Sequence, residues 1–179
     1  TIDNKKENNN LRIDFKKKIV ISGQIYDASN LLNLLTEKNN LNLFKNFSNE
    51  LEIKLKKITK SQISLKNFNL IGAIKKGKFN RISAKSEFSE GKYLDVSLKK
   101  DENNKKILEV YSDSPRALLS DYKFFEGIKG GKLLYNSTYD EINSVSKITI
   151  ENFKVIKAPA FATLLTLAYL GGIADALSG

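Results

Sequence analysis

Apolar and polar side chains alternate with a period of two along most of this chain, and that period limits its fold more than any other feature. The stretch from Glu50 to Lys56 shows it clearly, with Leu51, Ile53 and Leu55 set between charged residues. A period of two places every second side chain on the same side of a β-strand. The alternation therefore predicts strands with one apolar face and one polar face.

The same pattern recurs between turn-forming residues, which indicates an antiparallel meander. It is broken at 16–18, which leaves either one interrupted strand or two strands joined by a tight turn. Gly23 replaces an inward side chain and predicts a bend or a close approach, and Ile58 is out of phase and predicts a bulge near Lys57. The expected strands cover residues 11–25, 50–56, 63–74, 79–88, 93–98, 107–112, 132–139 and 145–156.

Helix signals occur in three further segments. Capping residues precede leucines at helical spacing after Asp27, Ser114 precedes Pro115, and Ala, Leu and Phe follow Pro159. The expected helices cover about residues 28–37, 114–126 and 159–177. The sequence thus predicts a mainly β fold of the α+β class, a curved antiparallel sheet of roughly eight to ten strands with about three short helices.

The last of these helices is unusual because no charge occurs from Ala158 to Ala174. Three interpretations remain open: a core helix that covers a sheet, a transmembrane span, or a helix beside a lipid-binding surface. The span is the least favoured, because the uncharged run is shorter than the ~20 residues that a bilayer requires. In addition, Gly171–Gly172 interrupts the run and Asp175 ends it.

The residue inventory argues against an enzyme. The chain contains no cysteine and no histidine, which removes the usual thiol nucleophile, the commonest general base and the commonest zinc ligands. We therefore expect no catalytic centre, no metal and no cofactor. Asp113 is interpreted as a capping residue. Acid–base catalysis by paired carboxylates would require two aspartates to come together in the fold. Nothing in the spacing of the candidates forces this, and the candidates are Asp27, Asp95, Asp113, Asp121, Asp140 and Asp175.

The glycine-rich stretch 127–133 does not match a phosphate-binding loop. Three residues rather than four separate Gly127 from the Gly131–Lys132 pair, and Leu133 stands where Ser or Thr is needed. We expect Gly127 to end a helix and Gly130–Gly131 to form a turn. The net charge of +10 does not indicate nucleic-acid binding, because the lysines are scattered and form no compact basic patch with aromatic residues.

Length and composition indicate a globular chain of one domain or little more. Residues 1–10 are polar and are expected to form a linker or frayed terminus, followed by a single domain over 11–179. Because the chain starts at Thr1 and contains no methionine, we expect it to be a piece of a longer protein.

Two sets of residues resemble a known signature. The first set is Ser112, Asp113, Leu118, Leu119, Gly127, Gly130, Gly131 and Leu133. The second set is Phe153, Val155, Ala158, Pro159, Leu164, Leu165, Leu167, Ala168, Gly172, Asp175, Leu177 and Gly179. Together they resemble the AsmA-like superfamily, and most closely the large YhdP-type envelope proteins. Pro115 departs from this pattern, since relatives usually have a small residue there.

The resemblance implies a fragment of a β-groove domain, folded like a taco shell. It implies a bridge-like parent protein that is anchored in the inner membrane of a Gram-negative bacterium, spans the periplasm and carries phospholipid toward the outer membrane. Acyl chains and other envelope proteins are then the expected partners, with the membrane reached through the parent protein. The alternative is a non-catalytic structural β-scaffold module of the cell envelope.

If the apolar faces line such a groove, their inward side chains contact acyl chains. The strand phases single out Leu51, Ile53, Leu55, Ile82, Ala84, Phe88, Leu94, Val96, Leu98, Leu108 and Val110 for this role.

Overall fold

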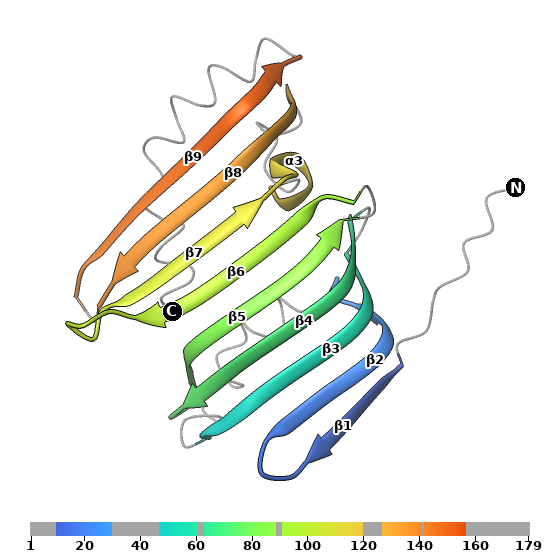
Figure 1. Cartoon of the computed structure of the whole chain (residues 1–179), viewed down its shortest axis with the longest axis vertical. Coiled ribbons are helices and arrows are strands. Elements are labelled where there is room, and N and C mark those ends of the chain that lie inside the picture. The colour runs from blue at the N-terminus through green and yellow to red at the C-terminus, as the bar shows by residue number, and fades with distance from the viewer. Residues whose placement is uncertain are drawn as a thin grey trace, which may run out of the picture. The chain divides into compact units, whose positions relative to one another are not determined.

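The computed structural model describes residues 10–29, 47–60, 63–88, 91–119, 127–140 and 142–156. Nine β-strands account for most of these residues (Figure 1). The strands fall into two compact units, one that ends at Gly91 and one that begins at Lys92. The chain is thus mainly β, as the alternation predicts.

The first unit contains strands that lie side by side in sequence order: β1 (Leu11–Phe15), β2 (Ile19–Asp27), β3 (Asn49–Lys60), β4 (Ile63–Lys75) and β5 (Lys78–Phe88). β1 and β2 form a hairpin, so the break at 16–18 is a turn between two strands. β4 and β5 are joined at Lys76 and Gly77, whose φ angles are 51° and 74°. Positive φ at both residues suits a tight hairpin turn.

The pairing of β2 with β3 is parallel, which corrects the expectation of a wholly antiparallel sheet. A short turn cannot join two parallel neighbours, because the chain must return to the end of the sheet at which β2 began. Residues 28–48 make this connection, and of these only 28, 29, 47 and 48 are described. The expected helix at 28–37 therefore lies almost wholly outside the described residues.

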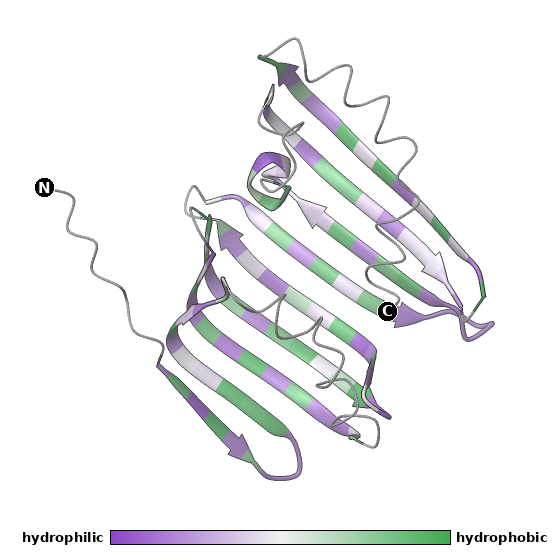
Figure 2. Cartoon of the chain, turned by 180° about the vertical axis from the view of Figure 1, so that it is seen from behind, coloured by the Kyte–Doolittle hydropathy of each residue, from purple (hydrophilic) through white to green (hydrophobic). Residues whose placement is uncertain are grey.

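The second unit is an antiparallel sheet of β6 (Tyr93–Lys100), β7 (Lys106–Ser112), β8 (Ile128–Tyr139) and β9 (Ser144–Val155), again in sequence order. Hydrophilic and hydrophobic residues alternate along the strands of both units (Figure 2). β9 pairs with β8 along its length, so the predicted hairpin partner of β8 at 145–156 is confirmed.

The described residues contain one helix, α3 (Pro115–Leu118), so the expectation of about three helices is not confirmed. Pro115 occupies the first turn of α3 as predicted, but Ser114 makes no side-chain capping hydrogen bond. The remainder of the expected helix at 114–126 is described only to residue 119, and the expected helix at 159–177 lies outside the described residues.

The bulge predicted near Lys57 is wrong. The register of β3 against β4 keeps one offset from Asn49 to Lys60. The shift instead occurs between β4 and β5, from Lys66 to Asn69. Asn67 lies at this point with φ of 52°, a left-handed conformation that Asn adopts more readily than most residues. The phase of β3 alone did not show which strand carried the irregularity.

Gly130 and Gly131 lie inside β8 rather than in a turn before it, so that prediction is also wrong. Their φ angles are 71° and 95°, and the ladder to β9 continues on both sides of them, with Gly130 opposite Phe153 and Lys132 opposite Glu151. A β-carbon on Gly131 would lie 3.0 Å from the Glu151 carbonyl oxygen and 3.0 Å from the Phe153 Cβ. Glycine thus lets the two strands remain paired through a distorted stretch.

The side chains buried most completely gather where β7, α3 and β8 meet. Ile128, Leu133, Pro115 and Ser112 are almost wholly inaccessible, and Ser112 lies opposite Leu133 in the ladder. The Ser112 Oγ accepts a hydrogen bond from the Ser114 N–H (3.0 Å). This corner is the packed core of the second unit.

Replacing Gly131 by alanine should destabilise the chain more than replacing Gly91. Both glycines have positive φ, at 95° and 72°, so each alanine should cost about 1–2 kcal/mol of backbone strain. Only at Gly131 does the new methyl group also meet neighbouring strand atoms, since nothing lies within 4 Å at Gly91. Thermal unfolding of the two variants checks this, and equal midpoints would contradict it.

Candidate functional site

The predicted groove residues of the first unit share one face of its sheet. Cross-strand partners lie on the same face, and Leu51 lies between Ile19 on β2 and Gly72 on β4. Leu70, the partner of Ile53, lies in turn opposite Ala84 on β5. We call this the apolar face of the first unit. It carries Leu51, Ile53, Leu55, Ile82, Ala84 and Phe88.

The predicted residues of the second unit likewise share one face of their own sheet. Leu98 lies opposite Leu108, and Val96 lies opposite Val110. Leu94 lies opposite the buried Ser112. This apolar face of the second unit therefore carries Leu94, Val96, Leu98, Leu108 and Val110.

Burial divides these eleven side chains into two groups. The buried group, 4–8% exposed, is Leu51, Leu55, Ala84, Phe88, Leu94 and Leu98. The half-buried group is Ile53, Ile82, Val96, Leu108 and Val110. The first group packs within the protein, whereas the second keeps accessible surface that an apolar ligand would cover.

A polar network interrupts the apolar face of the second unit on β8 and β9. The Tyr135 hydroxyl donates to the Ser146 Oγ (3.2 Å), which donates to the Ser137 Oγ (2.9 Å). Tyr135 lies opposite Val110 in the ladder. The sequence reasoning missed this network, although Ser137 and Tyr135 are in phase on β8.

Two lysines end the apolar face of the second unit. Lys100 and Lys106 lie directly opposite each other, next along the strands from the Leu98–Leu108 pair. The Lys106 ammonium also lies 5.8 Å from the centre of the Tyr139 ring. The apolar rows of the second unit therefore end at two cationic side chains.

The residues that carry the family resemblance serve turns and packing where the structure describes them. The carboxylate of Asp113 accepts hydrogen bonds from the Tyr111 hydroxyl (2.5 Å) and the Tyr93 N–H (3.2 Å), so Asp113 is not the helix cap that we expected. The Gly127 carbonyl accepts a hydrogen bond from the Ile156 N–H (2.8 Å). Ala158, Pro159, Leu164, Leu165, Gly172 and Asp175 lie outside the described residues.

The Tyr111–Asp113 hydrogen bond also governs the protonation of this corner. The Tyr111 hydroxyl, as the largest influence, lowers the pKa of the Asp113 carboxyl, and the Tyr93 N–H lowers it further. The same bond raises the pKa of Tyr111, because its hydroxyl proton is held by a carboxylate. Both groups therefore keep their usual charge states near neutral pH.

Compensated charges cover the polar face of the first unit. Glu52 pairs with both Lys18 and Lys54, and Arg81 pairs with Glu50 at 3.0 Å. The hydrogen bond from Lys18, followed by that from Lys54, lowers the pKa of the Glu52 carboxyl to about 2. The Glu52 side chain is 14% exposed, so this cluster is the best shielded ion-pair group on the polar face.

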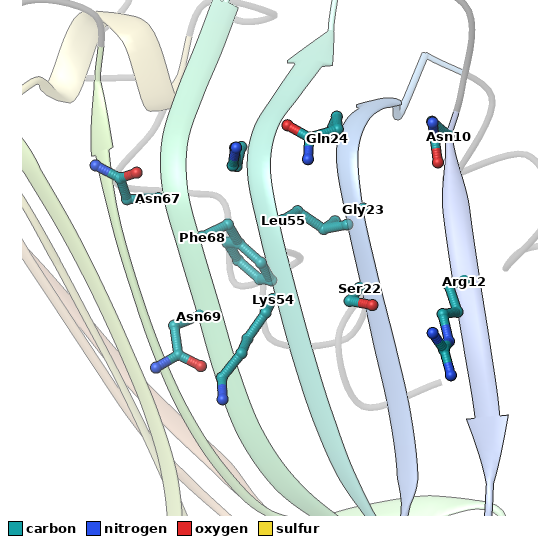
Figure 3. Close-up of a pocket in the computed structure, with 11 residues that line it drawn as sticks. Asn10, Arg12, Ser22, Gly23, Gln24, Lys54, Leu55, Asn67, Phe68 and Asn69 are labelled. Atoms are coloured by element: carbon teal, nitrogen blue, oxygen red, sulfur yellow. The ribbon is translucent and has the colours of Figure 1, made fainter.

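A hollow of about 590 Å³ opens beside this cluster (Figure 3). Its lining combines cationic side chains, amides, one hydroxyl and two apolar residues drawn from β1, β2, β3 and β4. We call it the polar hollow. It is lined by Asn10, Arg12, Ser22, Gly23, Gln24, Lys54, Leu55, Lys56, Asn67, Phe68 and Asn69.

Neither a metal centre nor a membrane-spanning helix emerges from the described part of the chain. It holds no cluster of three or more acidic, histidine or cysteine side chains that could bind an ion. No helix in the described ranges has the length and apolar character needed to cross a bilayer. The absence of a metal and of catalysis stays a prediction from the residue inventory.

Three comparisons with known proteins, by family model, by curated sequence and by solved structure, each give no match for this chain. The AsmA-like resemblance therefore remains a prediction from the residues quoted for it.

The stability of the chain should fall in acid because of Glu52. The Glu52 pKa is depressed from 4.5 to about 2, so its stabilisation is present above pH 4.5 and is lost as the pH falls toward 2. Urea unfolding of the chain and of Glu52→Gln across this range measures the effect. The loss between pH 4.5 and 2 should be smaller in the variant, and identical pH profiles would contradict the role of Glu52.

Proposed function

We propose that the chain is a lipid-binding segment of a periplasm-spanning, bridge-like protein of the AsmA-like type, which carries phospholipid between the inner and outer membranes of a Gram-negative bacterium. The observation that supports this most is the common face of the predicted groove residues within each unit. Strands with a continuous apolar face and a charged opposite face suit a support for acyl chains. The parent protein would supply the membrane anchor and the contacts with other envelope proteins.

The dimensions of the second unit suit one acyl chain. From Leu94 to Lys100 a strand rises about 20 Å, at about 3.4 Å per residue. One leaflet of a bilayer core is about 15 Å thick, half of the whole core. Each buried CH₂ contributes about 0.8 kcal/mol, so a dozen methylenes along the half-buried residues could offset the cost of leaving a bilayer. Hydrophobic contacts of this kind have no preferred direction, so they allow the acyl chain to slide along the apolar face.

The lysine pair gives the lipid an orientation. Lys100 and Lys106 lie at the end of the apolar rows, where an anionic phosphate would meet two ammonium groups. Holding the head group there places the acyl chain along Val96, Leu108 and Val110. The polar network around Ser146 bounds the same face on β8 and β9.

The second candidate is a structural β-scaffold module without a lipid. The observation in its favour is that Leu51, Leu55, Leu94 and Leu98 are already 4–8% exposed, as in an ordinary core. The two functions differ at the half-buried positions, which a scaffold has no reason to place against lipid.

Photo-crosslinking groups placed on the apolar faces should label phospholipid in the full-length parent protein. We choose the half-buried Ile53, Ile82, Val96 and Val110, because their side chains keep accessible surface. Lipid adducts, detected by mass spectrometry after irradiation, are expected at all four positions.

The matched controls are Lys54 and Lys85, which are exposed and stand out of phase with the apolar residues of their strands. Few adducts are expected there. Equal labelling at both sets, or no adducts at the apolar set, would contradict lipid transport and leave the scaffold.

Replacing the lysine pair should reduce the preference for anionic lipid. The double variant Lys100→Gln/Lys106→Gln removes one like-charge pair, so it should take up phosphatidylglycerol about fivefold less well, equivalent to about 1 kcal/mol, with uptake of phosphatidylcholine unchanged. Lys99→Gln/Lys147→Gln on the opposite face is the control of equal charge. Equal losses in the two double variants would rule out a head-group site.

A further inference from the structure

The backbone of the first unit is shaped around the polar hollow. At Gly23 a β-carbon would lie 2.1 Å from the Asn10 carbonyl oxygen, so only glycine allows the chain before β1 to come this close. Asn10 donates a backbone hydrogen bond to Ile25 (3.1 Å), which fixes that approach. On the other side, Asn67 is left-handed at the register shift between β4 and β5. Two departures from regular strand geometry therefore border the same hollow.

The lining of the hollow has the composition of a site for polar ligands. Four amide side chains, each with a donor and an acceptor, come from two strands, β2 and β4, and from the residue before β1. Ser22 adds a hydroxyl, and no carboxylate belongs to the lining. Its size lies within the range of about 300–1,000 Å³ that small-molecule sites occupy. The amides are those of Asn10, Gln24, Asn67 and Asn69.

The charge around the hollow is not fully compensated. Arg12 pairs with Asp14 (3.0 Å) and Lys54 pairs with Glu52. Lys56 is exposed and forms no ion pair within the described part of the chain. In Figure 3, Lys54 and Arg12 extend along the same side of the sheet, toward the same end of the hollow. Of the three cationic side chains in the lining, Lys56 is therefore the one that an anionic group would meet without an opposing acid in the described part of the chain.

We propose that the polar hollow binds an anionic sugar, that is, a sugar that carries a phosphate or a carboxylate. The cationic side chain of Lys56 holds the anion, since hydrogen bonds to ionised groups are the stronger ones. The amides pair with the sugar hydroxyls, which both donate and accept. Lys54 and Lys56 stand out of phase with Leu51 and Ile53 on β3, so the charged part of the site lies on the other face of the sheet, and the proposal does not rest on lipid transport.

Titration of the full chain with glucose 1-phosphate, followed by amide NMR shifts, tests the proposal. Shifts are expected to centre on Gln24, Lys56 and Asn67, and binding should weaken as salt is raised. Lys56→Gln should weaken binding about fivefold or more. Lys78→Gln, an exposed lysine at the start of β5 and outside the hollow, is the charge-matched control and should bind as the unaltered chain does.

Asn67→Gly gives a second test that does not threaten the fold. Glycine adopts the positive φ of this position without strain, so thermal unfolding should be almost unchanged while binding weakens. Neutral glucose and inorganic phosphate separate the two halves of the ligand, and each should bind several-fold more weakly than glucose 1-phosphate. Equal affinities for Lys56→Gln and Lys78→Gln, or inorganic phosphate binding as tightly as glucose 1-phosphate, would overturn the proposal.

Discussion

The period of two in the sequence is the constraint on which the strands of both units depend. Backbone hydrogen bonds hold each ladder together whatever the side chains are, but they do not decide which face is buried. That choice comes from the apolar residues in phase, such as Leu51 with Leu55 and Leu94 with Leu98, which are the buried members of their strands. A slip of one residue would turn all of them to the charged face. The register is therefore specified by burial, strand by strand.

Local pattern predicted the strands well, because each strand carries its own phase and its own turn signals. It failed where the answer depended on a distant segment. The parallel pairing of β2 with β3 follows from the long connection 28–48, and nothing in either strand reveals it. Asp113 looked like a cap beside Pro115, yet its carboxylate accepts hydrogen bonds from Tyr111 at the end of β7 and from Tyr93 on the neighbouring strand β6. Gly130 looked like a turn, yet β9 keeps pairing through it.

The candidate sites show the same difference between what a single strand determines and what the pairing of strands determines. Which residues share an apolar face was predictable from phase alone, since that is a property of single strands. The lysine pair at Lys100 and Lys106, the hydroxyl network at Ser146 and the polar hollow were not, because each arises from the register between strands. No spacing within one strand indicates that amides from β2, from β4 and from the residue before β1 will line one hollow. Cross-strand information was needed, and only the fold supplies it.

The register between strands also distinguishes lysines with particular neighbours from lysines that only reflect the composition of the chain. A chain with a net charge of +10 presents many lysines, and the presence of most of them does not indicate a binding site. The ladders show how the fold treats individual ones: Lys54 is held by Glu52 and Lys99 by Glu109 (3.1 Å), each from a nearby position on the same face. Against that background, Lys56 is distinguished by its place in a hollow lined with four amide side chains and no carboxylate. A cation among neutral donors and acceptors is the arrangement that the proposed ligand would complement, with its anion at the lysine and its hydroxyl groups at the amides.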